Sequence, residues 1–101
     1  MSVNLEYKAE LECLKQNRIV FVLRGTRFPE AIENGDVLLE SQTPPIKVRV
    51  SFARNVDSIF DIVPFLHLSG FSDCFSWVES FVHKKDGNRL SESFLYCLNR
   101  V

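Results

Sequence analysis

An alternating pattern from residue 46 to residue 53 constrains the fold of this chain more than any other feature. Apolar and polar side chains take turns along it: Ile46, Val48, Val50 and Phe52 against Lys47, Arg49 and Ser51. Successive side chains of a β-strand point to opposite faces, so this period of two predicts a strand over Ile46–Ala53 with one buried face. The chain must therefore build a sheet that is covered on one side.

The other segments place helices and further strands around this one. We expect strands over 2–7, 18–24, 36–40 and 91–101, helices over 8–16 and 73–85, and a short or irregular helix over 57–67. Pro64 interrupts that last segment, Ser72 is the expected N-cap of the helix after it, and Asn34-Gly35 predicts a turn. The order β-α-β-β-β-α-α-β predicts an α+β fold with a strongly curved sheet or small barrel and helices at its ends.

Length and charge limit the classes of protein that fit. A chain of 101 residues has room for a single domain, and 46% hydrophobic with 25% charged residues is typical of globular proteins. The net charge of −1 excludes a protein that coats nucleic acid by bulk charge, but a local basic patch is compatible with it. The opening residues contain no apolar core of a signal peptide, and no run is long enough to cross a bilayer.

The cysteines and histidines favour no chemistry of their own. Cys13, Cys74 and Cys97 lie far apart, and none belongs to a Cys-x-x-Cys motif. We therefore expect reduced, buried thiols in a cytoplasmic protein. His67 and His83 are separated from the cysteines, so we expect no metal site and no cofactor.

Several motifs, in this order, resemble the ASCH domain family. The segment from Leu14 to Arg24 resembles the family's opening helix-to-strand motif, and Gly35-Asp36 resembles the pair that opens its next strand. Gly70-Phe71 resembles the break before its second helix, and Phe94-Leu95-Tyr96 its closing strand. ASCH domains are related to RNA-binding PUA domains. The resemblance implies one PUA-like mixed β-barrel over residues 1–101, with about five strands and two or three helices.

The chain departs from the family where its small enzymes carry their chemistry. Members that remove an acyl group from acetylcytidine use a lysine, a threonine and a glutamate. The matching positions here are Ile19, Val22 and Ser69, and the motif glycine is Asn17. An aliphatic side chain can neither accept a proton nor stabilise an oxyanion. A shift of one residue would put Arg18 at the lysine position, and arginine stays protonated near neutral pH. The resemblance therefore favours a module without catalytic residues.

A set of basic residues is the candidate binding site: Arg18, Arg24, Thr26, Arg27, Lys47 and Arg49, with Arg54 as a further candidate. Arg18 and Arg24 share a face of their strand, and Lys47 and Arg49 share the outward face of theirs. If those faces converge, they form a groove for phosphate oxygens. In the resemblance, Arg24 lines the family's cleft, and residues 25–27 form its rim. The alternative is that these cations are solvated and paired with nearby acids.

The aromatic residues leave three functions open. Phe28, Phe71 and Trp77 are candidates for stacking on unpaired bases, although core packing is the commoner role of such residues. The first hypothesis is a cytoplasmic module that binds RNA or a nucleotide-like ligand in a basic cleft, with no membrane partner. A small amidohydrolase acting on a modified nucleoside is the second hypothesis. The third is a protein-interaction module that forms oligomers through exposed aromatic residues.

Overall fold

The computed structural model describes residues 8–33, 35–39, 44–84 and 89–101 of the chain. Within them the elements run α1 (Lys8–Asn17), β1 (Ile19–Arg24), β2 (Asp36–Leu39) and β3 (Ile46–Val56), then the 3₁₀ segments η1 (Ile59–Asp61) and η2 (Val63–Leu68). The chain continues through α2 (Cys74–Lys84), the 3₁₀ segment η3 (Leu90–Glu92) and β4 (Ser93–Arg100). These elements confirm an α+β fold. The strand expected over 2–7 lies outside the described residues.

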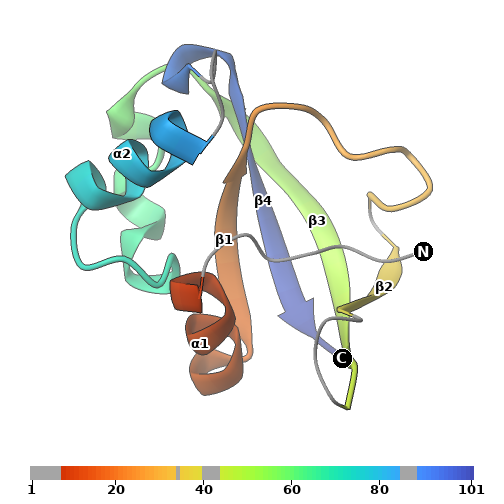
Figure 1. Cartoon of the computed structure of the whole chain (residues 1–101). Coiled ribbons are helices and arrows are strands. Elements are labelled where there is room, and N and C mark those ends of the chain that lie inside the picture. Colours follow the sequence, from red (N-terminus) through yellow and green to blue (C-terminus); the bar gives the residue numbers. More distant parts are fainter. Residues whose placement is uncertain (1–7, 34, 40–43, 85–88) are drawn as a thin grey trace.

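The described strands form a single curled sheet in the order β1-β4-β3-β2 (Figure 1). Every neighbouring pair is antiparallel. The last strand, β4, lies between β1 and β3, so Tyr96 is the partner of both Val22 and Phe52. This sheet has four strands, so a barrel of about five strands remains a prediction.

The alternating segment forms β3 as expected. A bulge in this strand turns its later side chains to the opposite face of the sheet. Val48 and Val50 are buried, whereas Lys47 and Arg49 are exposed. The register with β4 shifts between Phe52 and Arg54, which inserts one extra residue and turns the later side chains over. Val56 therefore faces the side of the sheet opposite to Phe52.

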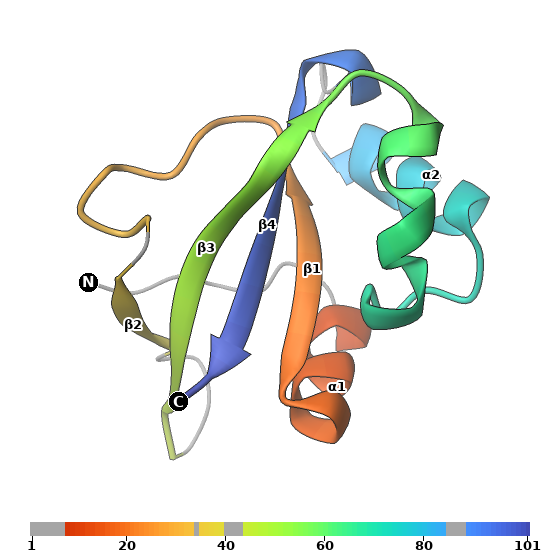
Figure 2. The ribbon, with the colours of Figure 1, turned by 180° about the vertical axis from the view of Figure 1, so that it is seen from behind.

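Two apolar clusters fill the two sides of the sheet. The first occupies the concave face, where Cys13 and Leu14 of α1 pack on inward residues of all four strands, such as Tyr96 and Leu98. The second lies on the other side, where Ile62, Trp77 and Phe81 cover Leu23 and Leu95. Figure 2 shows the helices after β3 gathered on this side, beside β1 and away from β2. Burial of apolar area on both faces is the main stabilising term of such a domain.

Three details of the helices correct the sequence expectations. Pro64 is at the start of η2 and does not interrupt a helix, since proline is tolerated in a first turn where its missing N–H is not needed. Asp73, not Ser72, caps α2: its Oδ1 accepts a hydrogen bond of 2.7 Å from the Ser76 N–H. The closing strand begins at Ser93, because residues 90–92 form a 3₁₀ turn.

Within the described residues, no helix combines the length and apolar character needed to cross a membrane.

Gly70 joins η2 to the start of the next helix by passing very close to α1. Its φ of +87° lies in the left-handed region, and a Cβ built on it would lie 2.2 Å from the Ala9 carbonyl oxygen. Both facts exclude a side chain at this position without movement of the backbone.

We expect Gly70→Ala to lower the free energy of unfolding by about 2 kcal/mol or more, because backbone strain and a steric clash add. Gly35→Ala is the control, since its Cβ would meet carbonyl oxygens at 3.3 Å, a contact that small shifts can relieve. Urea unfolding measures both variants. An equal loss in the two would contradict this account of Gly70.

Candidate anion-binding site

Arg24, the central residue of the predicted cleft, is buried against α1. Its Nη1 and Nη2 each donate a hydrogen bond of 3.2 Å to one oxygen of Glu10, and Nη1 also donates to the Leu23 carbonyl at 2.7 Å. Arg24 is 7% exposed and Glu10 is 1% exposed. This forked ion pair fixes α1 to the end of β1. Its guanidinium is therefore directed into the protein and not toward solvent.

Arg27 takes part in a group of contacts that we call the loop latch: Arg27, Glu33, Tyr96 and Phe52. Arg27 donates two hydrogen bonds to Glu33, of 3.0 and 2.8 Å, and its guanidinium carbon lies 4.0 Å from the centre of the Phe52 ring. The Tyr96 hydroxyl donates to Glu33 and accepts a 3.0 Å hydrogen bond from the Phe28 N–H. The latch holds the connection between β1 and β2 on the concave face.

The contacts of the loop latch shift the pKa values of Glu33 and Tyr96. Hydrogen bonds from Arg27 and then Tyr96 lower the pKa of Glu33 below its ordinary value of 4.5. Burial, and then the hydrogen bond to Glu33, raises the pKa of Tyr96 above its ordinary value of 10.0. Thr26 lies exposed beside this group.

Most of the other predicted cations are also paired. Arg49 donates a hydrogen bond of 2.9 Å to Asp36, and the amine of Lys47 lies 3.9 Å from the other oxygen of that carboxylate. Arg54 lies 2.9 Å from Asp61. The expected alternative, in which these cations are paired with nearby acids, therefore describes several of them.

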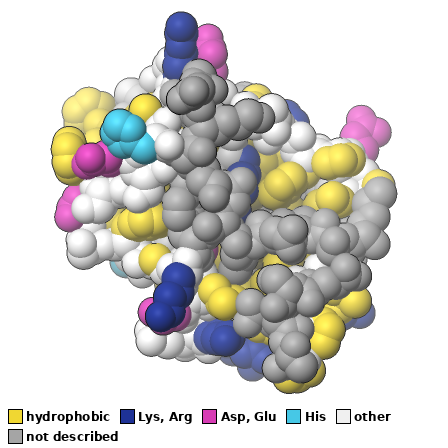
Figure 3. Space-filling model, viewed as in Figure 1, with side chains coloured by type: hydrophobic (Ala, Val, Ile, Leu, Met, Phe, Trp, Pro, Cys, Tyr) yellow, Lys and Arg dark blue, Asp and Glu magenta, His cyan; other side chains and the backbone are white. Residues whose placement is uncertain are grey.

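A different group of cations has no such partner. Lys15, Arg18 and Arg100 are exposed, and none forms an ion pair with a carboxylate in the described part of the chain. Arg18 ends α1 in the left-handed conformation with φ of 65°, and its carbonyl accepts a 2.9 Å hydrogen bond from the Arg100 N–H. We call these three residues the basic end. Figure 3 shows lysine and arginine side chains gathered there, at the lower end of the molecule, next to hydrophobic ones.

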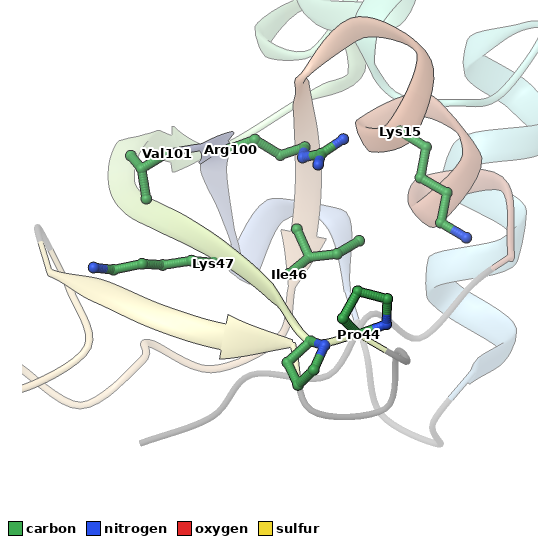
Figure 4. A pocket seen from close by; sticks show the side chains of 7 residues that line it. Lys15, Pro44, Ile46, Lys47, Arg100 and Val101 are labelled. Atoms are coloured by element: carbon green, nitrogen blue, oxygen red, sulfur yellow. The ribbon is translucent and has the colours of Figure 1, made fainter.

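An open pocket of about 590 Å³ lies at the basic end. Its described lining residues are Lys15, Pro44, Pro45, Ile46, Lys47, Arg100 and Val101. Figure 4 shows Lys15 and Arg100 on the same side of the sheet as Ile46, whereas the Lys47 amine points away, toward the beginning of β2. The pocket therefore combines a cationic wall with an apolar floor and contains no acidic side chain among these residues.

The predicted site residues fall into two groups. Arg18 and Lys47 lie at the basic end, with Arg49 close by on the outer face of β3. Arg24, Thr26 and Arg27 lie at the opposite end of β1, about 20 Å away at roughly 3.3 Å per strand residue. The two groups do not share one groove.

Sequence reasoning did not select Lys15 and Arg100 for the site. Lys15 belongs to the last turn of α1. Arg100 continues the inward series of Tyr96 and Leu98 along β4, so the alternation already placed it on the concave face. What the alternation could not show is that β4 ends beside α1.

The aromatic candidates for base stacking take part in packing. Trp77 is buried in the second cluster, and the Phe71 ring stacks on it at 6.5 Å and 13°. Phe28 lies 4.4 Å from the Tyr96 ring. Among the described residues, the most exposed aromatic ones are instead Phe60, at 81%, and Phe75, at 73%.

The positions that match the family's catalytic residues carry no reactive arrangement in the described residues. Val22 is buried and Ile19 is half-buried in β1. The Ser69 hydroxyl donates to the Leu66 carbonyl at 2.7 Å and accepts from the Phe71 N–H at 3.0 Å. Burial raises the pKa of the Cys13 and Cys97 thiols, which disfavours the reactive thiolate.

Comparisons with known proteins give no family: no family model, no curated protein and no solved structure matches the chain. The candidate site therefore stands on its own geometry.

We expect Arg24→Leu to lower the free energy of unfolding by about 3–5 kcal/mol, because it removes one member of a buried, doubly hydrogen-bonded ion pair. Arg54→Leu, which breaks an exposed ion pair, should cost about 1 kcal/mol or less. A Glu10→Leu/Arg24→Leu double variant should lose less than the two single losses combined. Guanidinium unfolding measures the wild type and four variants: Arg24→Leu, Glu10→Leu, the double variant and Arg54→Leu. Equal losses for Arg24→Leu and Arg54→Leu would contradict the buried pair.

Glu33 should contribute to the pH dependence of stability. Its folded pKa is lowered, so its contribution is present above its ordinary value of 4.5 and is lost as pH falls through the folded pKa. Glu33→Gln should therefore flatten the acid side of the stability curve below about pH 4.5. The matched control is Glu30→Gln, which removes an exposed carboxylate outside the latch on the same connection. Unfolding at a series of acidic pH values tests this. A curve unchanged by Glu33→Gln would show that the latch does not form in solution.

Proposed function

We propose that this protein is a non-catalytic module that binds RNA or a nucleotide-like anion at its basic end. One observation carries the proposal: Lys15 and Arg100 line an open pocket, Arg18 adjoins Arg100 through a backbone hydrogen bond, and none of the three has a carboxylate partner among the described residues. Unpaired cations that lie close together create a local positive potential even in a protein with a net charge of −1. Phosphate oxygens are the ligands that such a group attracts.

The apolar part of the pocket supports the same class of ligand. Pro44, Pro45 and Ile46 lie beside the cations and offer a surface for a sugar or a base. Ligand sites generally combine an apolar lining with a few well-placed polar groups. The arrangement fits a nucleotide better than a simple inorganic anion, which would gain nothing from the apolar floor.

The curled sheet is compatible with a PUA-like barrel, and we propose membership of the ASCH family on the sequence motifs. The described cysteines are free thiols, which supports a cytoplasmic location. The buried Arg24 moves the proposed site from the cleft that the resemblance implies to the opposite end of β1.

Titration with a short single-stranded RNA at two salt concentrations tests the function. Wild-type binding should weaken as salt rises, and Lys15→Ala/Arg100→Ala should weaken it about tenfold or more at low salt, because two phosphate contacts are lost. The matched control is Lys8→Ala/Arg89→Ala, which removes two positive charges away from the pocket. The control should bind like the wild type.

Equal weakening in both double variants would reduce the effect to overall charge and contradict the site. No binding at low salt would exclude the function. Phe60 and Phe75 favour a second candidate in that case, a protein-interaction module, since large exposed aromatic side chains are typical of interfaces. An apparent mass that rises with protein concentration, and that Phe60→Ser/Phe75→Ser abolishes, would support it.

A further inference from the structure

We infer that the pocket at the basic end recognises a phosphate monoester on a nucleoside, either a free mononucleotide or the phosphorylated end of a single strand. This inference rests on the proposed function and narrows its ligand. The observation behind it is the pairing of a two-cation wall, Lys15 and Arg100, with an apolar floor within one pocket.

The charge of the pocket fits a monoester better than a diester. A phosphate monoester has a second pKa near 6, so it carries about −1.5 to −2 at neutral pH, whereas an internal phosphodiester carries a single charge. Lys15 and Arg100 supply two positive charges from two different elements, α1 and β4, and Arg18 adjoins them. The guanidinium of Arg100 can bind two oxygens of one phosphate as a fork, while Lys15 acts as a point charge.

The shape and volume of the pocket also favour the terminal phosphate of a strand, or a free nucleotide, over the interior of a continuous strand. Ile46 packs against the first apolar cluster, so the pocket is closed behind its floor by the core of the protein. Its volume of about 590 Å³ is that of a site for one small ligand. A long polyanion would need a track of free cations, but Arg24, Arg27, Arg49 and Arg54 are each held by a carboxylate.

The proposed pose follows from these two parts. The terminal phosphate lies between Lys15 and Arg100, and the nucleoside lies on Pro44, Pro45 and Ile46. Proline rings lose little conformational freedom on contact, so they form a preorganised apolar surface. The pocket includes no described side chain that could remove the phosphate, and binding without turnover is the expected outcome.

Four small probes separate the contributions of the phosphate charge and of the nucleoside to the binding affinity. They are adenosine 5′-monophosphate, adenosine 3′,5′-cyclic monophosphate, adenosine and inorganic phosphate. Titrations of the full chain should show the monophosphate binding about tenfold or more tightly than each of the others, because only it combines two charges with a nucleoside. Its affinity should rise as pH increases through about 6, where the second phosphate proton is lost. The cyclic diester should show no such rise.

Single substitutions test whether the preference for the monophosphate arises at this pocket. Lys15→Ala and Arg100→Ala should each remove most of the preference for the monophosphate over the cyclic diester, whereas Lys8→Ala should retain it. A tetranucleotide RNA with a 5′-phosphate, compared with one bearing a 5′-hydroxyl, identifies the source of the monoester. Preference for the phosphorylated strand assigns the pocket to strand ends, and binding of the mononucleotide alone assigns it to free nucleotides; either result supports the inference.

The results that would overturn the monoester inference differ from those that would overturn the proposed function. Equal affinity for the monophosphate and the cyclic diester, with binding still sensitive to Lys15→Ala, would overturn the monoester inference and leave anion binding intact. No binding of any probe or of either tetranucleotide would overturn the proposed function itself.

Discussion

The placement of β4 between β1 and β3 is the constraint on which the rest of this structure depends. β1 and β3 are not neighbours in the sheet, so the first and middle strands are joined only through the last one. Leu95 and Tyr96 are buried on opposite faces of β4, and each anchors one of the two apolar clusters. Because β4 runs antiparallel to β1, its end returns to the start of β1. That return brings Arg100 next to Arg18 and Lys15.

The described arginines have two roles, and their partners decide which: some form ion pairs that stabilise the fold, and others leave a positive charge on the surface. Arg24 is buried with Glu10, where a charge is tolerated only because its partner and hydrogen bonds replace water. Arg27 packs on Phe52 and binds Glu33, so its charge serves to hold a loop. Lys15, Arg18 and Arg100 lack such partners among the described residues, so a positive surface remains where these three lie together, at the basic end. A basic residue in a sequence is therefore weak support for a binding site until its neighbours are known.

Much of the fold followed from local rules, and most of the site did not. The strand over 46–53, the first helix and the strand after it were predicted because side-chain periodicity and β-branched residues act over a few neighbours. The change from a helix to two 3₁₀ segments at 59–68, and the shift of the α2 cap to Asp73, depend on geometry that periodicity does not encode. Arg24 was assigned to a cleft by the resemblance and to one face with Arg18 by its spacing, but the partner that buries it lies 14 residues away, on α1.

The sequence by itself determined which residues face inward along β3 as far as Phe52 and along β4, the presence of an α+β domain and the absence of an overall basic charge. These follow from the alternation of a strand, the period of a helix and a count of charges, all of which are local or additive. The tertiary structure alone decided which cations are neutralised and which remain free, because ion pairs join residues that are distant in the chain. It also decided that Lys15, Ile46 and Arg100 share one pocket, since only the antiparallel order of the strands brings those three segments together.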